Sequence, residues 1–398
     1  MRRHPEQQVF RRPWAQVTLV TVTAVAVAVF LATIPTFRHF FDLGVYRGAV
    51  RSWLIDGNEL YDYRYQDTEY GFTYPPFAAL VMSPLAITSW PVAVAVAVLL
   101  NGAAVVVLIR WYFMPVLRRR EWPVWTPCAL MFLGFLVFEP SRDTFSYGQV
   151  NLLLLVLVCS DLRNRKLAGV GIGLAAAIKL TPVVFIGYLV LSRQYRQAAT
   201  AVAAAAGATV LALLIAPSAS AEFWTDAVWD TGRIGKLYYV SNQSLRGVVA
   251  RLDGPPTLWL TAVALVVAYW CWWVRSRKPE PVLGFAVTGV IACLISPITW
   301  VHHLVWLIPG VFLLLDRAVR IPAAEPRRRQ LAVLATGFVI MSSSLVWIWW
   351  AHPLGWGAFP GSNAYVWLSL VVLAALTQEA GRTAPIFAHG IPAEADRS

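Results

Sequence analysis

The feature that most constrains this chain is a series of long apolar runs, of which residues 15–34 are the first. That run holds twenty residues without a charge, enough to cross a hydrocarbon core of about 30 Å at about 1.5 Å per residue. Hydrophobic residues make up 58% of the 398 residues and charged ones 14%, a balance too apolar for a water-soluble globule. The sequence therefore predicts an all-α, polytopic membrane helix bundle, built as one domain over residues 1–398.

The basic residues lie in alternate loops. Most of them, 23 of the 33 Lys and Arg, fall in the segments 2–12, 110–120, 163–166, 193–196, 275–278, 317–329 and 378–398. Because membrane insertion leaves Lys and Arg in the cytoplasm, these segments are predicted to be cytoplasmic, including the N-terminus (1–14) and the tail (378–398). Bases dispersed among apolar spans form no nucleic-acid surface despite the net charge of +12, so no nucleic-acid partner is expected.

Crossing the membrane at each alternation gives about twelve transmembrane helices. Their ranges are 15–34, 91–113, 124–139, 149–161, 167–178, 182–192, 198–216, 257–274, 281–296, 301–316, 330–350 and 364–377. The fourth, fifth and sixth are short for full crossings, so tilted or broken helices are expected there and the count is open by two. The first run is too long for a signal peptide and lacks a small-residue cleavage site, so we expect a retained helix.

Two long loops are predicted on the extracytoplasmic side, at residues 35–76 and 217–256. The first collects six acids: Asp42, Asp56, Glu59, Asp62, Asp67 and Glu69. It also contains "RGAVRSWLIDG", whose apolar spacing predicts a short amphipathic helix at the interface. After it, Pro75 and Pro76 break the helix, and the apolar stretch that follows is too short to span, so we expect a re-entrant or interfacial element.

Asp42 is the acid that we single out as catalytic. It lies eight residues beyond the first apolar run, inside the aromatic stretch "FFDLGVY", and therefore near the membrane surface. A carboxylate there could act as the general base on an alcohol, and burial among aromatic side chains would raise its pKa toward a useful range. Any other acid of this loop is expected to be a solvated loop residue.

Several cations are predicted on the same side and could bind a phosphate. Lys179 stands among apolar spans, where a charge usually marks a functional site, although a lysine that extends to the membrane surface is the alternative. His302 and His303 begin a span on the external side, and Arg246 lies in the second long loop. Since no third ligand stands at a suitable spacing from the two histidines, we expect neither a metal ion nor another cofactor.

Neutral amides and hydroxyls at the mouths of the spans could hydrogen-bond the hydroxyl groups of a sugar. This set contains Tyr147, Gln149 and Asn151 from "SYGQVN" and Asn242 and Gln243 from "SNQSLRG". Tyr46 and Tyr74, in "FFDLGVYRGA" and "FTYPPF", complete the predicted sugar-binding and acceptor-binding residues. The many external Trp residues are predicted mainly as an aromatic belt at the interface.

The motifs "FFDLGVYRGA", "FTYPPFAALVMSPLA", "SYGQVNLLLL", "GIGLAAAIKLTP", "SNQSLRGVVARL" and "SPITWVHHLVWLIPG" together resemble glycosyltransferase family 87. Its members are actinobacterial mannosyltransferases of the GT-C superfamily that use polyprenyl-phosphate mannose. The likeness runs in order from about residue 40 to 310. Each motif is weak alone, and the shared order makes the resemblance specific.

The resemblance implies a GT-C bundle in the bacterial plasma membrane, with an extracytoplasmic active site and Asp42 as the base. It implies inverting α-(1→2) transfer of mannose from a polyprenyl-phosphate donor to a mannosylated lipid: a phosphatidylinositol mannoside, lipomannan or lipoarabinomannan. The expected partners are therefore this donor, this acceptor and membrane lipids. Two alternatives stay open on the sequence alone: another GT-C activity, such as arabinosyl transfer or lipid-linked glycan ligation, and a twelve-span secondary transporter.

Overall fold

The computed structural model describes residues 12–33, 37–66, 68–119, 123–164, 166–230 and 235–378. The predicted cytoplasmic N-terminus and tail lie almost wholly outside the described residues. So do Asp67 of the first long loop and residues 231–234 of the second. The described part of the chain is helical and contains no strand, so the predicted all-α class is confirmed.

Five helical segments in the described ranges are long and apolar enough to cross a membrane. They are α2 (Pro13–Thr33), the continuous segment α5 (Trp90–Leu108), η2 (Ile109–Phe113) and α6 (Met114–Arg119), α12 (Tyr195–Ile215), α15 (Pro256–Arg277), and η5 (Val301–Leu307) with α17 (Ile308–Arg320). Of α2, only Gln16 and Val27 are buried, whereas the segment η5–α17 is mostly buried. The chain is therefore a membrane protein with some helices facing lipid and others inside the bundle.

The remaining predicted spans are also helical, but they are shorter. They are α7 (Trp125–Val137), α8 (Glu139–Tyr147) with α9 (Asn151–Ser160), α10 (Val170–Ile178), α11 (Val183–Leu191), α16 (Pro281–Ile295), α18 (Ala324–Ser342) with η6 (Leu345–Trp349), and α20 (Ala364–Thr377). α8 and α9 form one apolar pair bent by 114°, which gives the broken helix expected near residue 149. The count of twelve crossings stays a prediction.

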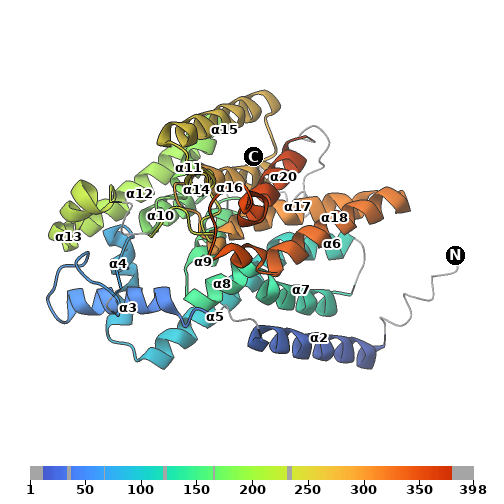
Figure 1. Ribbon diagram of the computed structural model, residues 1–398, viewed down its shortest axis with the longest axis horizontal. Coiled ribbons are helices and arrows are strands. Elements are labelled where there is room, and N and C mark those ends of the chain that lie inside the picture. The colour runs from blue at the N-terminus through green and yellow to red at the C-terminus, as the bar shows by residue number, and fades with distance from the viewer. Residues whose placement is uncertain are drawn as a thin grey trace, which may run out of the picture.

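The bundle is built around α16, which is buried along almost its whole length. α2 lies along one edge of the molecule and α15 along the opposite edge (Figure 1). α3 (Phe41–Leu54), α4 (Pro76–Met82) and α13 (Pro217–Glu222) gather at the end of the bundle where α2 finishes, on the left of Figure 1. Both long loops therefore contribute helices to the same end.

α3 is the amphipathic helix of the first long loop, and it begins earlier than the predicted motif. Val45, Tyr46, Ala49 and Val50 are buried on one face, and Leu54 is exposed. The buried face packs against α4 and the short helix η1 (Ser83–Ala86), so α3 is anchored in protein rather than resting on lipid alone. The element after Pro75 is α4 followed by η1, a short and largely buried pair.

The second long loop contains α13, η3 (Phe223–Ala227) and α14 (Leu245–Arg251). It packs beside α19 (Phe359–Ser362), where Gln243 Nε2 donates to the carbonyl of Ser362. Arg251 ties it to the bundle from a fully buried position. Its Nε and Nη2 donate to Asn363 Oδ1 at 3.0 and 2.5 Å, and its Nη1 donates to the carbonyl of Tyr239 at 2.8 Å. A charged donor bonded three times in this way fixes the loop over the core.

Candidate functional site

Asp42 is positioned by the turn that leads from the first span into α3. His39 and Phe40 both have left-handed backbone, with φ of 51° and 54°, a conformation that costs energy in residues other than glycine. The turn is fastened to the end of α8: the backbone N–H of Arg38 donates to Ser146 Oγ at 2.5 Å and that of Phe40 to the carbonyl of Ser146 at 2.8 Å. Asp42 then occupies the first turn of α3.

The bend between α8 and α9 brings Gln149 to Asp42. Gly148 ends α8 with φ of 71°, and a Cβ there would lie 2.6 Å from the Cβ of Leu43, so the position requires glycine. Asn101 on α5, which is buried, donates to the backbone carbonyl of Gln149 at 3.1 Å. The bend is therefore held from two sides.

A chain of hydrogen bonds starts at the Asp42 carboxylate. Gln149 Nε2 donates to Asp42 Oδ2 at 2.7 Å, and Gln149 Oε1 accepts from the Tyr74 hydroxyl at 3.0 Å. The hydroxyls of Tyr74 and Tyr46 lie 2.9 Å apart, and Asn151 Nδ2 is 3.4 Å from Gln149 Oε1. The predicted Asp42, Gln149, Asn151, Tyr46 and Tyr74 thus meet in one group.

Lys179 joins this group from the turn between α10 and α11. Its Nζ lies 2.9 Å from Asn151 Oδ1, 3.2 Å from the Tyr74 hydroxyl and 2.9 Å from His303 Nε2. It also lies 5.0 Å from the centre of the Tyr74 ring. Its position at the C-terminal end of α10 suits a cation, because the helix dipole is negative there.

The hydrogen bonds around His303 fix the proton on its ring. The backbone N–H of Trp300 donates to His303 Nδ1 at 3.1 Å, so the neutral imidazole carries its proton on Nε2. That proton points at Lys179 Nζ, which must accept it while donating to Tyr74 and Asn151. Two donated bonds and one accepted bond are the pattern of a neutral amine.

Burial shifts the pKa of both Asp42 and Lys179, which lie outside the membrane-spanning helices. Burial raises the pKa of Asp42 to about 6, although the Gln149 hydrogen bond and the charge of Lys179 oppose the rise. Burial lowers the pKa of Lys179 to about 7, against the attraction of Asp42. A carboxylate and an amine that titrate near neutrality are typical of groups that exchange protons in a reaction.

His302 and Tyr147 form the next part of the site. The ring of His302 contacts those of Tyr147 and His303 edge to face, with centroids 5.1 and 4.7 Å apart. His302 Nε2 is buried and has no hydrogen-bond partner in the described part of the chain. It is therefore available to a polar group of a ligand.

The other predicted residues lie apart from this group. Asn242 and Gln243 are fully buried and use their amides on backbone groups, from Thr299 and Pro297 to Ser362 and Tyr365. They hold the second long loop and are not available to bind a sugar. Their role is structural, and we do not carry them into the proposed site.

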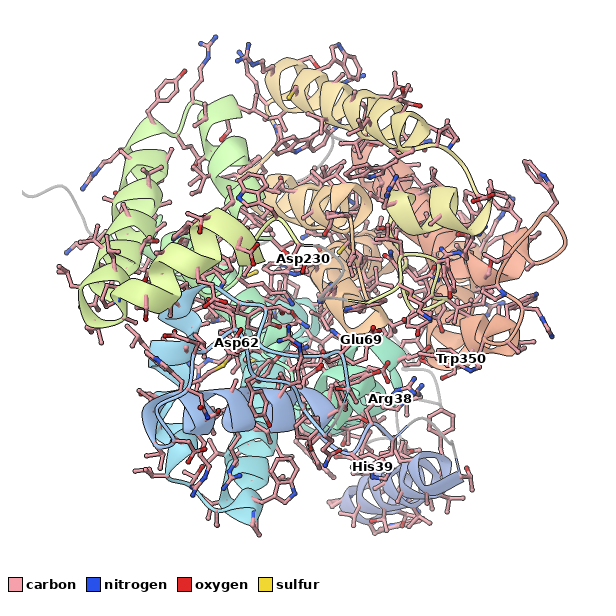
Figure 2. The ribbon with its side chains drawn as sticks, turned by 60° about the vertical axis from the view of Figure 1, so that its left-hand side comes forward. Arg38, His39, Asp62, Glu69, Asp230 and Trp350 are labelled. Carbon is pink, nitrogen blue, oxygen red and sulfur yellow. The ribbon has the colours of Figure 1, made fainter. Side chains whose placement is uncertain are left out.

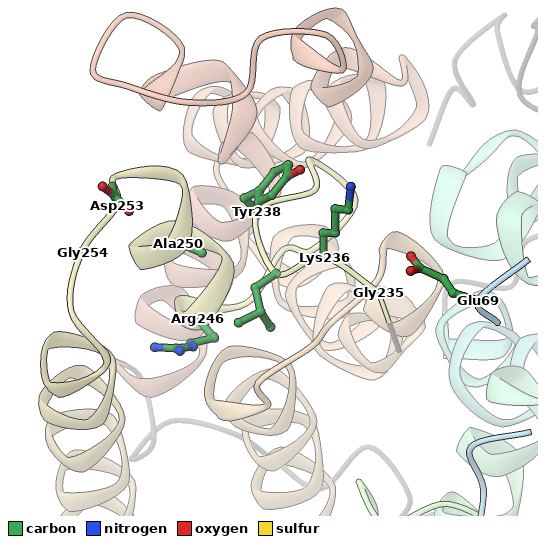
Figure 3. Close-up of a pocket in the computed structure, with 9 residues that line it drawn as sticks. Glu69, Gly235, Lys236, Tyr238, Arg246, Ala250, Asp253 and Gly254 are labelled. Atoms are coloured by element: carbon green, nitrogen blue, oxygen red, sulfur yellow. The ribbon is translucent and has the colours of Figure 1, made fainter. Parts of the chain in front are cut away.

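Arg246 is likewise separate from the Asp42 group. Its guanidinium lies over the ring of Trp259, 5.0 Å from the centroid. It lines a cavity of about 470 Å³ between the two long loops, whose other residues include Glu69, Lys236 and Tyr238. Figure 3 shows Arg246 and Glu69 on opposite sides of that cavity.

The structure adds two residues that the sequence analysis did not single out. Asn101 anchors the bend at Gln149, and Arg38 places its guanidinium over the Trp347 ring at 4.2 Å and near that of Tyr147 at 5.6 Å. Arg38 carried one usable signal, since a base directly after a span, on the side that the sequence predicts to be external, departs from the usual distribution of charge. Among the described residues, no three His, Cys, Asp or Glu side chains are grouped as metal ligands would be.

The Asp42 carboxylate, linked through Gln149 and Tyr74 to Lys179 and His303, lies within a helical membrane bundle, an arrangement that suits transfer from a lipid-linked donor. The comparisons with known proteins agree. The model of glycosyltransferase family 87 matches residues 72–297. The chain belongs to this family, and it is a glycosyltransferase.

Curated relatives match most of the chain. One from Mycobacterium tuberculosis is named a polyprenol-phosphate-mannose-dependent α-(1-2)-phosphatidylinositol mannoside mannosyltransferase; it is 31% identical over 86% of this chain and 86% of its own length. A protein of the same name from Mycolicibacterium smegmatis is 34% identical over 67% of this chain and 68% of its own length. A phosphatidylinositol pentamannoside mannosyltransferase of that organism is 32% identical over 75% and 74%. No solved structure matches the chain.

Proposed function

We propose that this enzyme transfers mannose from polyprenyl-phosphate mannose to a phosphatidylinositol mannoside, forming an α-(1→2) linkage with inversion. The names of its relatives support both substrates. The observation that carries the proposal is the Asp42 carboxylate, bonded to Gln149 at 2.7 Å in the group that contains Lys179. Membership in a glycosyltransferase family argues against the transporter alternative.

The reaction we propose is a single displacement. The 2-hydroxyl of the acceptor attacks C1 of the donor mannose while Asp42 takes the hydroxyl proton. The bond from C1 to the phosphate oxygen breaks, and polyprenyl phosphate leaves with the electron pair. The sugar passes through a transition state of oxocarbenium character, and a phosphate is a good enough leaving group to need no second carboxylic acid.

Lys179, His303 and His302 are proposed to receive the phosphate of the donor. Lys179 carries three polar contacts that hold it in place, and His302 Nε2 is buried without a partner in the described ranges. Positioned donors of this kind stabilise the negative charge that develops on a leaving phosphate. A bound phosphate would favour uptake of a proton from solvent by the Lys179 amine, because charge pairing stabilises the ammonium form. Lys179 would then no longer accept the proton of His303 Nε2, which becomes free to donate to the phosphate.

We further propose a GT-C architecture in the bacterial plasma membrane, with this site on the extracytoplasmic face. The distribution of Lys and Arg among the loops supports that orientation. A lipid-linked donor also fits an external site, because nucleotide sugars stay in the cytoplasm. Tyr147 lies beside His302 and is proposed to contact the sugar.

The test is transfer of labelled mannose by the purified enzyme in lipid. The donor is polyprenyl-phosphate mannose, and the acceptors are phosphatidylinositol mannosides of increasing length, short mannans and a mannose-free phosphatidylinositol. We expect α-(1→2)-linked product from at least one phosphatidylinositol mannoside. Transfer from polyprenyl-phosphate arabinose instead of the mannosyl donor would overturn the proposed donor.

A further inference from the structure

A second cavity lies beside α3, on a different face of that helix from Asp42. It has a volume of about 650 Å³ and is lined by α3, the segment 63–66 and the start of α5. Phe41, Gly44 and Gly48 line it from α3, at the spacing of one helix face, whereas Asp42 and Tyr46 lie on nearly the opposite side of the helix from Gly44 and Gly48. The cavity and the Asp42 group therefore flank the same helix.

The cavity is basic. Arg38, His39 and Arg47 line it, and none of the described residues that line it is acidic. Arg47 is fixed there by donating from Nε to the carbonyl of Thr88 at 3.0 Å. Figure 2 shows Arg38 and His39 on the chain that leaves α2. Three bases on the face that we place outside the membrane run against the usual distribution of charge.

Arg38 lines the cavity, and its guanidinium reaches toward Trp347 and Tyr147, which do not line it. Its Nε and Nη2 are buried and have no hydrogen-bond partner among the residues that the structure describes. Buried polar groups rarely lack a partner, and guanidinium groups pair with phosphate through two parallel N–H bonds. Stacking on Trp347 at 4.2 Å holds the guanidinium plane in place.

Aromatic rings supply the other walls of the cavity. Tyr63, Tyr65 and Trp90 line it, and the first two lie directly against α3. A Cβ at Gly48 would be 1.9 Å from the Tyr63 hydroxyl, and one at Gly44 would be 2.5 Å from the Tyr65 ring. These glycines let the rings pack against the helix backbone, where they offer apolar faces and hydroxyls to a sugar.

The cavity opens beside a surface that faces lipid. Trp90 is the first residue of α5, which begins an apolar segment of 30 residues. Along α5, Val92, Val96 and Leu99 are exposed, as expected of side chains in contact with acyl chains. A ligand with its head group in the cavity could extend its chains along this face.

We propose that this cavity binds the phosphorylated, sugar-bearing head group of the acceptor lipid. The proposal rests on the proposed function, and it deepens it by assigning the acceptor phosphate to Arg38 and Arg47. The donor also carries a phosphate, but its proposed ligands Lys179 and His303 do not line this cavity. A head group of several sugars would run from the cavity around α3 to present its terminal 2-hydroxyl to Asp42.

The test is a binding experiment on the Asp42→Asn protein, which holds acceptor without turnover. The ligands are short-chain phosphatidylinositol dimannoside, the uncharged dimannosyl diacylglycerol, mannose-free phosphatidylinositol, polyprenyl-phosphate mannose and inorganic phosphate. Arg38→Gln and Arg47→Gln are each expected to raise Kd for the dimannoside by at least about tenfold, the loss typical of a charged hydrogen bond. For Arg47→Gln, the Kd values for the uncharged glycolipid and for the donor are expected to stay unchanged; Arg38 also lies beside Tyr147, so its variant is compared on the dimannoside and the uncharged glycolipid alone.

Arg51→Gln is the matched control. Arg51 lies one turn further along α3 and donates from Nη1 to the carbonyl of Ala86 at 3.3 Å, but it does not line the cavity. Arg51→Gln removes the same charge from the same helix as Arg47→Gln, so its Kd values are expected to match those of the parent Asp42→Asn protein. Equal weakening by Arg51→Gln and Arg47→Gln would overturn the proposal, as would weakened donor binding in Arg47→Gln. Binding of inorganic phosphate or mannose-free phosphatidylinositol as tightly as the dimannoside would also overturn it.

Two further measurements keep the outcome decisive. Arg47→Lys retains the charge but not the planar guanidinium, so it is expected to weaken dimannoside binding by less than Arg47→Gln does. If Arg47→Gln does not fold, weakening by Arg47→Lys of dimannoside binding alone, with none for Arg51→Gln, still supports the site. The transfer assay is run separately on proteins with Asp42 intact. Absence of transfer with selective binding retained would refute the proposed function alone, whereas transfer with unchanged acceptor KM in both arginine variants would refute the acceptor site alone.

Discussion

Gln149 Nε2 donates to Asp42 Oδ2 at 2.7 Å across 107 positions of the chain. The amide is fixed in this orientation because its Oε1 accepts from the Tyr74 hydroxyl. One carboxylate oxygen is thus held by the enzyme, and the other has no hydrogen bond to a described residue. For the general base that we propose, this arrangement fixes the carboxylate and leaves one oxygen for the proton of the incoming hydroxyl.

Gln149→Leu should lower kcat by about tenfold to a hundredfold and leave the donor KM nearly unchanged, because it releases the base without touching the phosphate ligands. The hydrogen bond from Gln149 lowers the pKa of Asp42. Its loss should therefore move the acid limb of the kcat profile to higher pH. Steady-state rates measured from pH 5 to 8 test this, and an unmoved acid limb would contradict the positioning role.

The pH dependence of the wild-type enzyme follows from two groups. Asp42 must be ionised to accept a proton, so activity should rise with pH through about 6, the pKa that burial gives it. Lys179 must be protonated to meet a phosphate, so kcat/KM for the donor should fall above about pH 7. We expect an optimum between these values. In Lys179→Arg the alkaline limb should disappear, since arginine stays charged; persistence of that limb would assign it to another group.

Lys179→Met should raise the donor KM by at least about tenfold, since it removes a charged donor from the phosphate. Lys236→Met is the comparison, because Lys236 lines the separate cavity that contains Arg246. Its donor KM should match that of the wild type. A raised donor KM in Lys236→Met together with a normal one in Lys179→Met would move the donor phosphate to the cavity of the second long loop.

Arg251→Met should lower the free energy of unfolding by about 2–4 kcal/mol, because it leaves Asn363 Oδ1 and the Tyr239 carbonyl without their buried donor. Arg246→Met lies on the same helix at the surface of a cavity and should change this free energy by less than about 1 kcal/mol. Denaturant unfolding in detergent measures both. Equal stability of the two variants would remove Arg251 from its anchoring role.

The sequence predicted the helices well, because the length of each apolar run can be read directly from the residues. Each of the twelve predicted ranges contains a helix, yet among the described residues only five long helical segments qualify as spans by themselves. The difference arises because a helix that faces lipid and a helix that is buried within the protein have similarly apolar sequences. α16 illustrates this: its run of fifteen residues is almost wholly enclosed by other helices.

Membership of the candidate site was harder to predict. Residue type suggested that Gln149 and Gln243 were equivalent amides, but Gln149 faces Asp42 whereas Gln243 is bound to the backbone of α19 and α20. Only tertiary packing separates them. Arg38 offered only its unusual place after the first span, and that its Nε and Nη2 lack a hydrogen-bond partner among the described residues is evident only in the folded chain.

The most direct test of the central claim is the rate of mannose transfer by Asp42→Asn. The substitution keeps the size of the side chain and removes the base, so transfer should fall by at least about a hundredfold. Elution volume and binding of polyprenyl-phosphate mannose should match those of the wild type. Transfer at the wild-type rate by this folded variant would contradict the assignment of Asp42 as the base.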